Sequence, residues 1–218
     1  MSVAHSRSEL QPGLWHWTAP HPQWDSEQEV SSYAVDDGAR LLLFDPIAVP
    51  GEIEALADRR ETAIVLTSPW HERDTRSLLE GHGWPLFSPP PDRPADLVRK
   101  YGVTEQEAAG GSPDLAWLPV GAAHYYAAGD RLPVGVETFP GWEHNDVVLW
   151  IERRHAIVVG DSLVDFGDGL EVWPHEGLRT PRAQVFERLR PLLALPVELV
   201  LATHGGPADR AALERAFA

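Results

Sequence analysis

Three short apolar runs in the chain each end in a polar segment that carries ionisable residues. Continuous apolar runs of this length are typical of strands that are buried on both faces. Ligand sites in proteins that combine helices and sheets usually lie where strands end and loops begin. We therefore expect the three ends to converge on one site. The runs and the segments that follow them are 64–66 before 67–74 (TSPWHERD), 157–159 before 160–162 (GDS), and 199–201 before 203–206 (THGG).

The sequence predicts strands first and then helices interleaved with strands. This order occurs twice along the chain. Alternating residues separated by turn residues predict hairpins of strands 29–35 with 40–44 and of strands 146–151 with 155–159. Apolar residues at helical spacing predict the helices. This pattern favours two sheets with helices outside, an α+β protein with an αββα sandwich. The expected helices are 51–60, 74–81, 95–101, 181–193 and 208–217.

Two segments do not fit this repeated order. Residues 1–12 are expected to be a loose N-terminal arm. Residues 89–118 begin with three prolines and contain the Gly110-Gly111 pair. We interpret them as an insertion that connects the two halves over one face and not as a domain boundary. The whole chain, 1–218, is therefore expected to be a single domain.

Composition limits the classes of partner. The chain has 218 residues and a formal net charge of −15, and such an acidic surface disfavours binding to nucleic acids or anionic membranes. There is no cysteine, which excludes disulfides, thiolate metal sites and a cysteine nucleophile. The N-terminal segment lacks the apolar core of a secretory signal, and no apolar run is long enough for a membrane span. We expect a cytoplasmic protein with a small-molecule ligand, either as a monomer or as a homodimer.

Six short sequence segments, in this order, resemble those of the metallo-β-lactamase fold superfamily, and the resemblance covers residues 13–217. Each segment is weak alone, but their order and spacing together imply the four-layer αββα sandwich of that family. The resemblance further implies that Asp45 is a buried carboxylate at a strand end. The segments are 42–45 (LLFD), 64–67 (IVLT), 129–130 (GD), 139–141 (FPG), 158–161 (VVGD) and 201–205 (LATHG).

The metal-binding motif of that family is altered in this chain. Its His-x-His-x-Asp-His motif is replaced by residues 68–73, SPWHER, and its Pro-Gly-His histidine by Trp142. Only Asp161 and His204 remain as standard ligands. The indole nitrogen of tryptophan and the guanidinium of arginine only donate hydrogen bonds, so neither coordinates a metal. The resemblance therefore does not imply the standard dinuclear zinc centre.

Two functional hypotheses remain open. In the first, the protein has lost the metal and any cofactor, and it binds a small molecule or is an inactive relative of hydrolases. In the second, it hydrolyses an ester or thioester with one zinc or another divalent ion, and Glu72 is a candidate base. The pocket expected in both cases is formed by Ser68, Trp70, His71, Trp142, His144 and His204. The ligands of the second hypothesis are His71, His144, Asp161 and His204.

Arg73 stands where the family has a ligand of the second metal. We expect its guanidinium to replace that cation and to pair with Asp161 or Glu72, so Glu72, Arg73 and Asp161 are the candidate catalytic residues. Residues 160–163 also spell GDSL, a motif of serine esterases, with Ser162 as nucleophile and His204 as base. A match of four residues in the middle of the chain is weak support for that chemistry.

Overall fold

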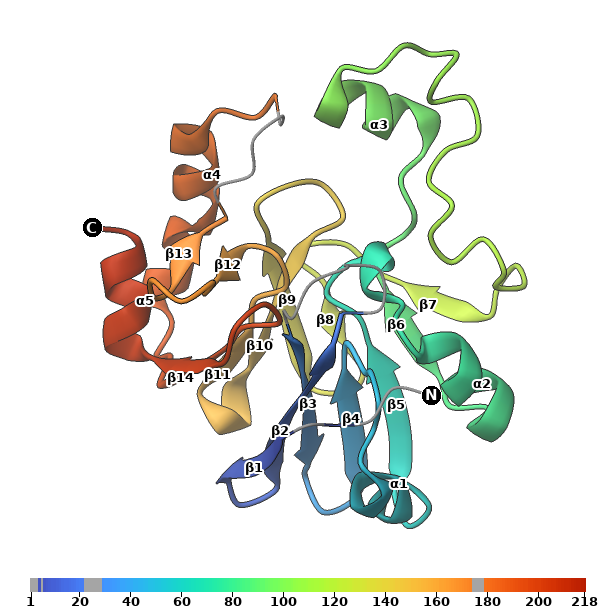
Figure 1. Cartoon of the computed structure of the whole chain (residues 1–218), viewed down its shortest axis with the longest axis vertical. Helices are drawn as coiled ribbons and strands as arrows, with labels where there is room; N and C mark the ends of the chain where they lie inside the picture. Colours follow the sequence, from blue (N-terminus) through green and yellow to red (C-terminus); the bar gives the residue numbers. More distant parts are fainter. Residues whose placement is uncertain (1–3, 5, 22–28, 174–178) are drawn as a thin grey trace.

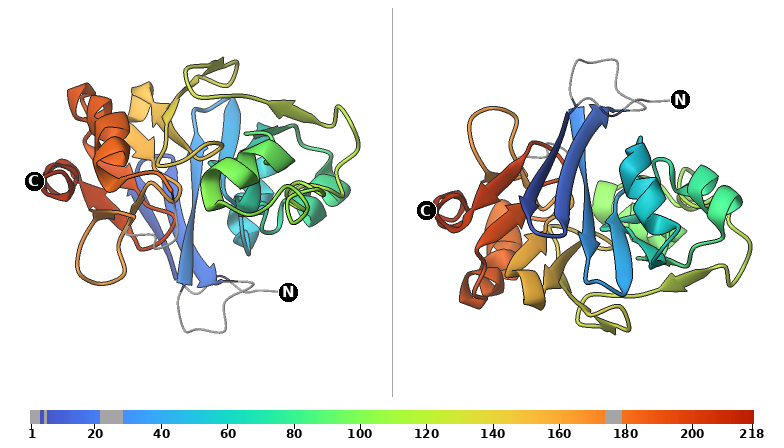
Figure 2. Two further views of the ribbon diagram at one scale, coloured as in Figure 1. Left: turned by 90° about the horizontal axis from the view of Figure 1, so that it is seen from above. Right: turned by 90° about the horizontal axis from the view of Figure 1, so that it is seen from below.

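The computed structural model describes residues 4, 6–21, 29–173 and 179–218. Two β-sheets lie face to face, and helices cover the outer face of each (Figure 1). Seen from above and from below, the same layers separate clearly, with the N-terminal and C-terminal halves on opposite sides (Figure 2). The fold is thus the predicted αββα sandwich.

The first sheet contains seven strands in sequence order. Strands β1 to β4 pair antiparallel, and β4 to β7 pair parallel. The strands are β1 Ser6–Gln11, β2 Leu14–Pro20, β3 Glu29–Asp36, β4 Arg40–Phe44, β5 Glu61–Val65, β6 Leu86–Ser88 and β7 Ala123–Tyr125.

The second sheet contains six strands in the order β15-β14-β11-β10-β9-β8. Strands β11 and β14 pair parallel, and the other neighbours pair antiparallel. A separate two-stranded ribbon joins β12 Leu163–Val164 to β13 Glu171–Val172. The strands of the second sheet are β8 Arg131–Leu132, β9 Val136–Pro140, β10 Val147–Ile151, β11 Ala156–Val158, β14 Leu199–Leu201 and β15 Pro207–Asp209.

Within the described residues, five α-helices complete the layers. Helices α1 and α2 cover the first sheet, α4 and α5 cover the second, and α3 lies at the rim (Figure 1). The helices are α1 Gly51–Ala57, α2 Thr75–His82, α3 Pro94–Tyr101, α4 Arg182–Leu189 and α5 Arg210–Ala216. Three short 3-10 helices are η1 Pro69–His71, η2 Glu152–Arg154 and η3 Arg190–Ala194. No described helix has the length and apolar character that crossing a membrane requires.

Side-chain alternation explains why the central strands are apolar throughout. Leu42 and Phe44 of β4 face the core between the sheets, whereas Leu41 and Leu43 face α1. In the second sheet, Leu149 faces the core between the sheets, and its neighbours on the strand face α4 and α5. Because both faces of these strands are covered, both sets of side chains are apolar.

Two expectations are corrected. Residues 6–11 of the presumed arm form β1, which pairs with β2, so this part of the N-terminal segment is ordered in the first sheet. The expected helix 181–193 ends as an α-helix at Leu189 and continues as η3. Pro191 lacks the N–H that a continuing α-helix needs, which accounts for the change.

Helix α3 lies within the connector 89–118. Pro94 occupies its first turn, and the Asp96 carboxylate accepts the N–H of Arg93 at 3.0 Å, which satisfies a free donor of the helix start. Gly102 ends the helix in the left-handed conformation, with φ of 70°. Local sequence signals therefore define both ends of the connector helix. The connector lies beside the polar ends of the strands (Figure 1).

Candidate functional site

The three predicted strand ends converge. Parallel pairing of β4 with β5 and of β11 with β14 places the carboxyl ends of each pair at one edge. A bridge between Val30 and His204 and the hydrogen bond from Ser31 N to Thr203 O at 2.9 Å join the two sheets at that edge. Topology therefore brings together side chains that are more than 130 residues apart in sequence.

Three buried side chains form the centre of the site. The Nε2 atoms of His71 and His204 each lie 3.1 Å from the same atom, Oδ1 of Asp161. The three atoms that could coordinate a metal ion, one from each residue, lie within 4.8 Å of one another. The Asp161 Oδ1 atom is buried and makes no aligned hydrogen bond with any described group. This cluster of His71, Asp161 and His204 is called the central triad below.

The orientation of His71 is fixed from behind. Its Nδ1 atom lies 3.0 Å from Asp45 Oδ2 and 3.0 Å from Thr67 Oγ1. Asp45 is fully buried, as expected of the carboxylate at this strand end, and it also accepts the backbone N–H of Thr67 at 2.9 Å. Burial alone would lower the pKa of His71, but the carboxylates of Asp161 and Asp45 outweigh it and raise the pKa to about 9.

Asp161 is held by its second oxygen. The indole N–H of Trp70 donates to Asp161 Oδ2 at 2.7 Å. Burial would raise the pKa of Asp161, but the two imidazoles hold it well below the ordinary value. The neighbouring Asp146 accepts the Asp161 backbone N–H at 3.3 Å, and burial together with the Asp161 charge raises its pKa. The pKa values of these two neighbouring carboxyl groups are therefore shifted in opposite directions.

Aromatic rings surround His204. The ring of Trp173 meets it edge to face at 5.6 Å between centroids, Phe166 lies at 6.2 Å, and His21 stacks at 6.1 Å. Burial lowers the pKa of His204 even though Asp161 acts in the opposite direction. His204 is therefore a neutral imidazole at pH 7 in an apolar setting.

Arg73 points into the molecule, but its expected ion pairs are not formed. Its Nη1 donates to the carbonyl oxygens of Ser31 at 2.7 Å and of Asp45 at 2.8 Å. Among the described residues none of its hydrogen bonds goes to Asp161 or Glu72. Its Nη2 is buried without a hydrogen bond. The prediction of direct pairing is wrong because backbone carbonyls at the strand ends take the guanidinium.

Glu72 does not have the free carboxylate of a general base. Its Oε2 accepts the backbone N–H of Leu115 at 2.8 Å and the indole N–H of Trp117 at 3.0 Å. These contacts hold the connector against the loop after β5.

Ser68 is fully buried, and its hydroxyl makes no hydrogen bond with any described group.

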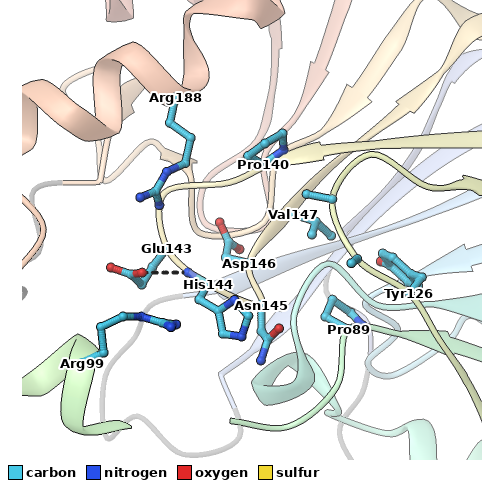
Figure 3. Close-up of a pocket in the computed structure, with 12 residues that line it drawn as sticks. Pro89, Arg99, Tyr126, Pro140, Glu143, His144, Asn145, Asp146, Val147 and Arg188 are labelled. Atoms are coloured by element: carbon cyan, nitrogen blue, oxygen red, sulfur yellow. Dashed lines mark hydrogen bonds between the residues drawn. The ribbon is translucent and has the colours of Figure 1, made fainter. Parts of the chain in front are cut away.

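His144 does not join the central triad. It groups instead with Asp92 and Asp96, and its Nε2 lies 3.6 Å from Asp96 Oδ1 with the side chain 41% exposed. The expected four-ligand set is therefore reduced to three. His144 lies in the wall of a cleft of about 330 Å³, which also has Arg99 from α3 and Arg188 from α4 in its lining. Figure 3 shows these side chains.

Trp142 and Ser162 have structural contacts. Trp142 is buried in the core under α4 and α5, where it stacks on Trp173 at 6.3 Å. It therefore supports the aromatic wall and does not fill the central triad itself. The Ser162 hydroxyl is fully buried and donates to Asp146 Oδ2 at 2.5 Å, which does not leave it available as an esterase nucleophile.

The central triad fits one divalent ion. Two imidazole nitrogens and one carboxylate oxygen are the three protein ligands of many catalytic zinc sites, which keep a fourth position for water. The buried Asp161 Oδ1 without an aligned donor is the acceptor that a cation would satisfy. The second oxygen of this carboxylate, Oδ2, already accepts the indole N–H of Trp70.

Sequence reasoning did not find Lys100, Asp92 or Asp146. Lys100 and Asp92 form a buried pair at 2.6 Å, and Asp146 lies under Asp161. Lys100 is the only lysine of the chain, which is a weak signal that could have drawn attention to it. Long-range packing brings Asp92 and Asp146 to the site. No local sequence pattern predicts that they lie there.

Comparison with solved structures finds close similarity of fold. DIM-1 metallo-β-lactamase exposed to ceftazidime has a TM-score of 0.69 and 13% identity, over 99% of this chain and 95% of that one. TTHA1623 in a di-iron-bound form has a TM-score of 0.59 and 23% identity, over 90% and 98%. ST1585 from Sulfolobus tokodaii, an archaeal metallo-β-lactamase superfamily protein, has a TM-score of 0.61 and 15% identity, over 86% and 78%. No protein-family model matches the sequence, and comparison with curated proteins gives no significant match.

Proposed function

We propose that this chain, which has the metallo-β-lactamase fold, is a hydrolase with a single divalent metal ion held by His71, Asp161 and His204. The observation that carries the proposal is the convergence of two imidazole Nε2 atoms on Oδ1 of Asp161, a buried oxygen that accepts no aligned hydrogen bond from the described residues. A divalent ion in such a site polarises a carbonyl and lowers the pKa of its coordinated water. The expected substrate is an ester or a thioester.

The chain's own residues prepare the site for that chemistry. Asp45 and Thr67 contact Nδ1 of His71, so its Nε2 faces the triad. This carboxylate–histidine arrangement is the usual support of a metal ligand. The Arg73 guanidinium supplies a fixed positive charge nearby, and its unbonded Nη2 can stabilise a negatively charged oxygen. Glu72 is not assigned as a base, because the connector occupies its carboxylate.

Metal analysis of the purified protein tests this proposal. We expect about one zinc, manganese or iron ion per chain in the wild type, and close to none in His204→Ala. His155→Asn is the matched control, because His155 pairs with Glu198 at the surface and its left-handed backbone suits asparagine. Hydrolysis of 4-nitrophenyl acetate and of an acetyl thioester should follow the metal content. A wild-type protein that stays metal-free after incubation with each ion would refute the proposal.

A second candidate function is a metal-free binder of an apolar small molecule. Trp173 and Phe166 beside His204 favour it, because aromatic side chains line most small-molecule pockets. Under this candidate a chelator leaves the melting temperature unchanged, and an aromatic probe such as indole raises it in the absence of metal. The same two measurements therefore separate the binder from the hydrolase.

A further inference from the structure

Lys100 is buried although it lies on a short helix at the rim of the molecule. It is 1% exposed, and the other seventeen basic residues of the chain are arginines. Its Nζ lies 2.6 Å from Asp92 Oδ2. Removing an ammonium from water costs several kcal/mol, and a buried ion pair is often no more stable than an apolar replacement. A role in holding α3 in place is therefore a poor explanation of a buried lysine.

The ammonium of Lys100 also contacts a residue of the central site. Its Nζ lies 4.7 Å from the centre of the Trp70 indole ring. The same indole donates its N–H to Asp161 Oδ2 at 2.7 Å. A cation over the face of an indole is attracted by its π electrons, and it draws electron density from the ring. The N–H thereby becomes a stronger donor to the carboxylate.

The indole N–H of Trp70 determines which oxygen of Asp161 is available to a metal ion. Oδ2 is occupied by Trp70, whereas Oδ1 faces the two imidazoles without an aligned hydrogen bond. A carboxylate held in this way presents Oδ1 to a metal ion, while the indole N–H holds Oδ2. The Lys100–Trp70 contact is therefore placed where it can determine the orientation of the Asp161 carboxylate.

We propose that Lys100 is a positioning residue that acts through Trp70 to hold Asp161 as a one-oxygen ligand for a single metal ion. The inference rests on the proposed single-metal site and adds to it how the ligand Asp161 is oriented. The contacts extend to the cleft wall, because Asp92 Oδ1 accepts the Asn145 amide at 2.9 Å and Asn145 lines the cleft (Figure 3). The connector helix, the cleft and Asp161 are thus linked by hydrogen bonds and by one cation–π contact.

Cobalt(II) titration of four proteins tests the inference. The proteins are the wild type, Lys100→Met, Trp70→Phe and the double variant. Methionine keeps the length of the side chain without the charge, and phenylalanine keeps a ring without the N–H. We expect one ion per wild-type chain and a roughly 10- to 100-fold weaker affinity in each single variant, as for other residues that support metal ligands. The visible absorption bands of bound cobalt should shift in both. Arg215→Met, at an exposed position of α5 outside the site and the cleft, is the control.

The double variant separates positioning from a purely structural role. If Lys100 acts through the Trp70 N–H, Lys100→Met should have little further effect on cobalt affinity once Trp70 is phenylalanine. Additive losses, or a Lys100→Met protein that binds cobalt as the wild type does, would overturn the inference while leaving the metal site intact. A wild type that takes two ions also overturns it. A wild type that binds none overturns the proposed function itself. If Lys100→Met does not fold, unchanged cobalt affinity in Trp70→Phe still refutes the inference.

Discussion

The Nδ1 atom of His71 lies 3.0 Å from Oδ2 of Asp45, and both side chains are buried. This contact holds the imidazole with Nε2 toward Asp161, at 3.1 Å. A carboxylate behind a ligand histidine fixes its tautomer and increases its basicity. The geometry of the central triad therefore depends on a residue that contacts no metal.

The first prediction concerns Asp45→Asn. An asparagine keeps the shape but removes the charge, so we expect zinc affinity to fall about 10- to 100-fold while the fold is retained. Competition with a chromophoric chelator measures the affinity. Asp74→Asn is the control, since the Asp74 carboxylate accepts the N–H of Ala48 at 2.7 Å and has no contact with His71 among the described hydrogen bonds. Equal zinc affinity in Asp45→Asn and the wild type would contradict the prediction.

The second prediction concerns removal of the metal. An ion that binds the folded protein alone stabilises it, by about 2.7 kcal/mol at a free concentration of 100 times Kd. Chelator should therefore lower the melting temperature of the wild type, and added zinc should restore it. In His204→Ala, zinc and chelator should leave the melting temperature unchanged. If zinc raised the melting temperature of His204→Ala by as much as that of the wild type, the ion would bind elsewhere.

The fold could be predicted from the sequence because its signals are local and repeated. The apolar runs of β4, β5 and β11 alternate between two covered faces, and each ends in a polar turn. Asp161 and His204 directly follow such runs, so topology alone places them at one edge. Their meeting was therefore predictable from strand order.

The remaining part of the site depends on side-chain geometry that no pattern encodes. Arg73 has φ of 41°, and its guanidinium turns toward backbone carbonyls in place of the predicted carboxylates. His144 follows a turn that directs it to Asp96. Lys100 lies on α3 between Arg99 and Tyr101, which are both exposed, and its burial results from the way the connector packs on Trp70. These are long-range effects, and spacing along the chain does not reveal them.

The third prediction concerns pH and His16. Burial lowers the pKa of His16 to about 4, and its Nε2 bonds to Ser31 Oγ at 2.8 Å. In the unfolded chain its pKa returns to about 6.5, so between these values the unfolded state binds more protons than the folded state. The stabilisation is complete above pH 6.5 and is lost as the pH falls toward 4.

His16→Gln removes this titration and keeps a polar group near Ser31. Urea unfolding at pH 7 and pH 4 should show that the wild type loses up to about 3 kcal/mol more than the variant on acidification. Comparison with the variant cancels the contributions of the other ionisable groups. The same loss in both proteins would mean that His16 is not the group responsible.

The fourth prediction concerns Glu72. Glu72→Ala leaves the N–H groups of Leu115 and Trp117 without their acceptor, and should destabilise the protein by about 1–3 kcal/mol. Urea unfolding measures the change, with exposed Glu80→Ala as the control. Glu72→Gln keeps an acceptor, so ester hydrolysis should stay within about tenfold of the wild type. A far larger loss of activity, of the 10²–10⁴-fold size that a base contributes, would restore Glu72 as the base.

The last prediction concerns the junction of the two sheets. Tyr33 of β3 donates its hydroxyl to the carbonyl of Ala202 at 2.6 Å, and both residues are fully buried. Tyr33→Phe leaves that carbonyl without this donor and should cost about 1–3 kcal/mol, measured by urea unfolding. The exposed Tyr125→Phe should cost close to nothing. Because Ser31 N and the Val30 bridge still hold the segment of His204, zinc affinity should change little. A large loss of zinc in Tyr33→Phe would show that this one hydroxyl positions the ligand.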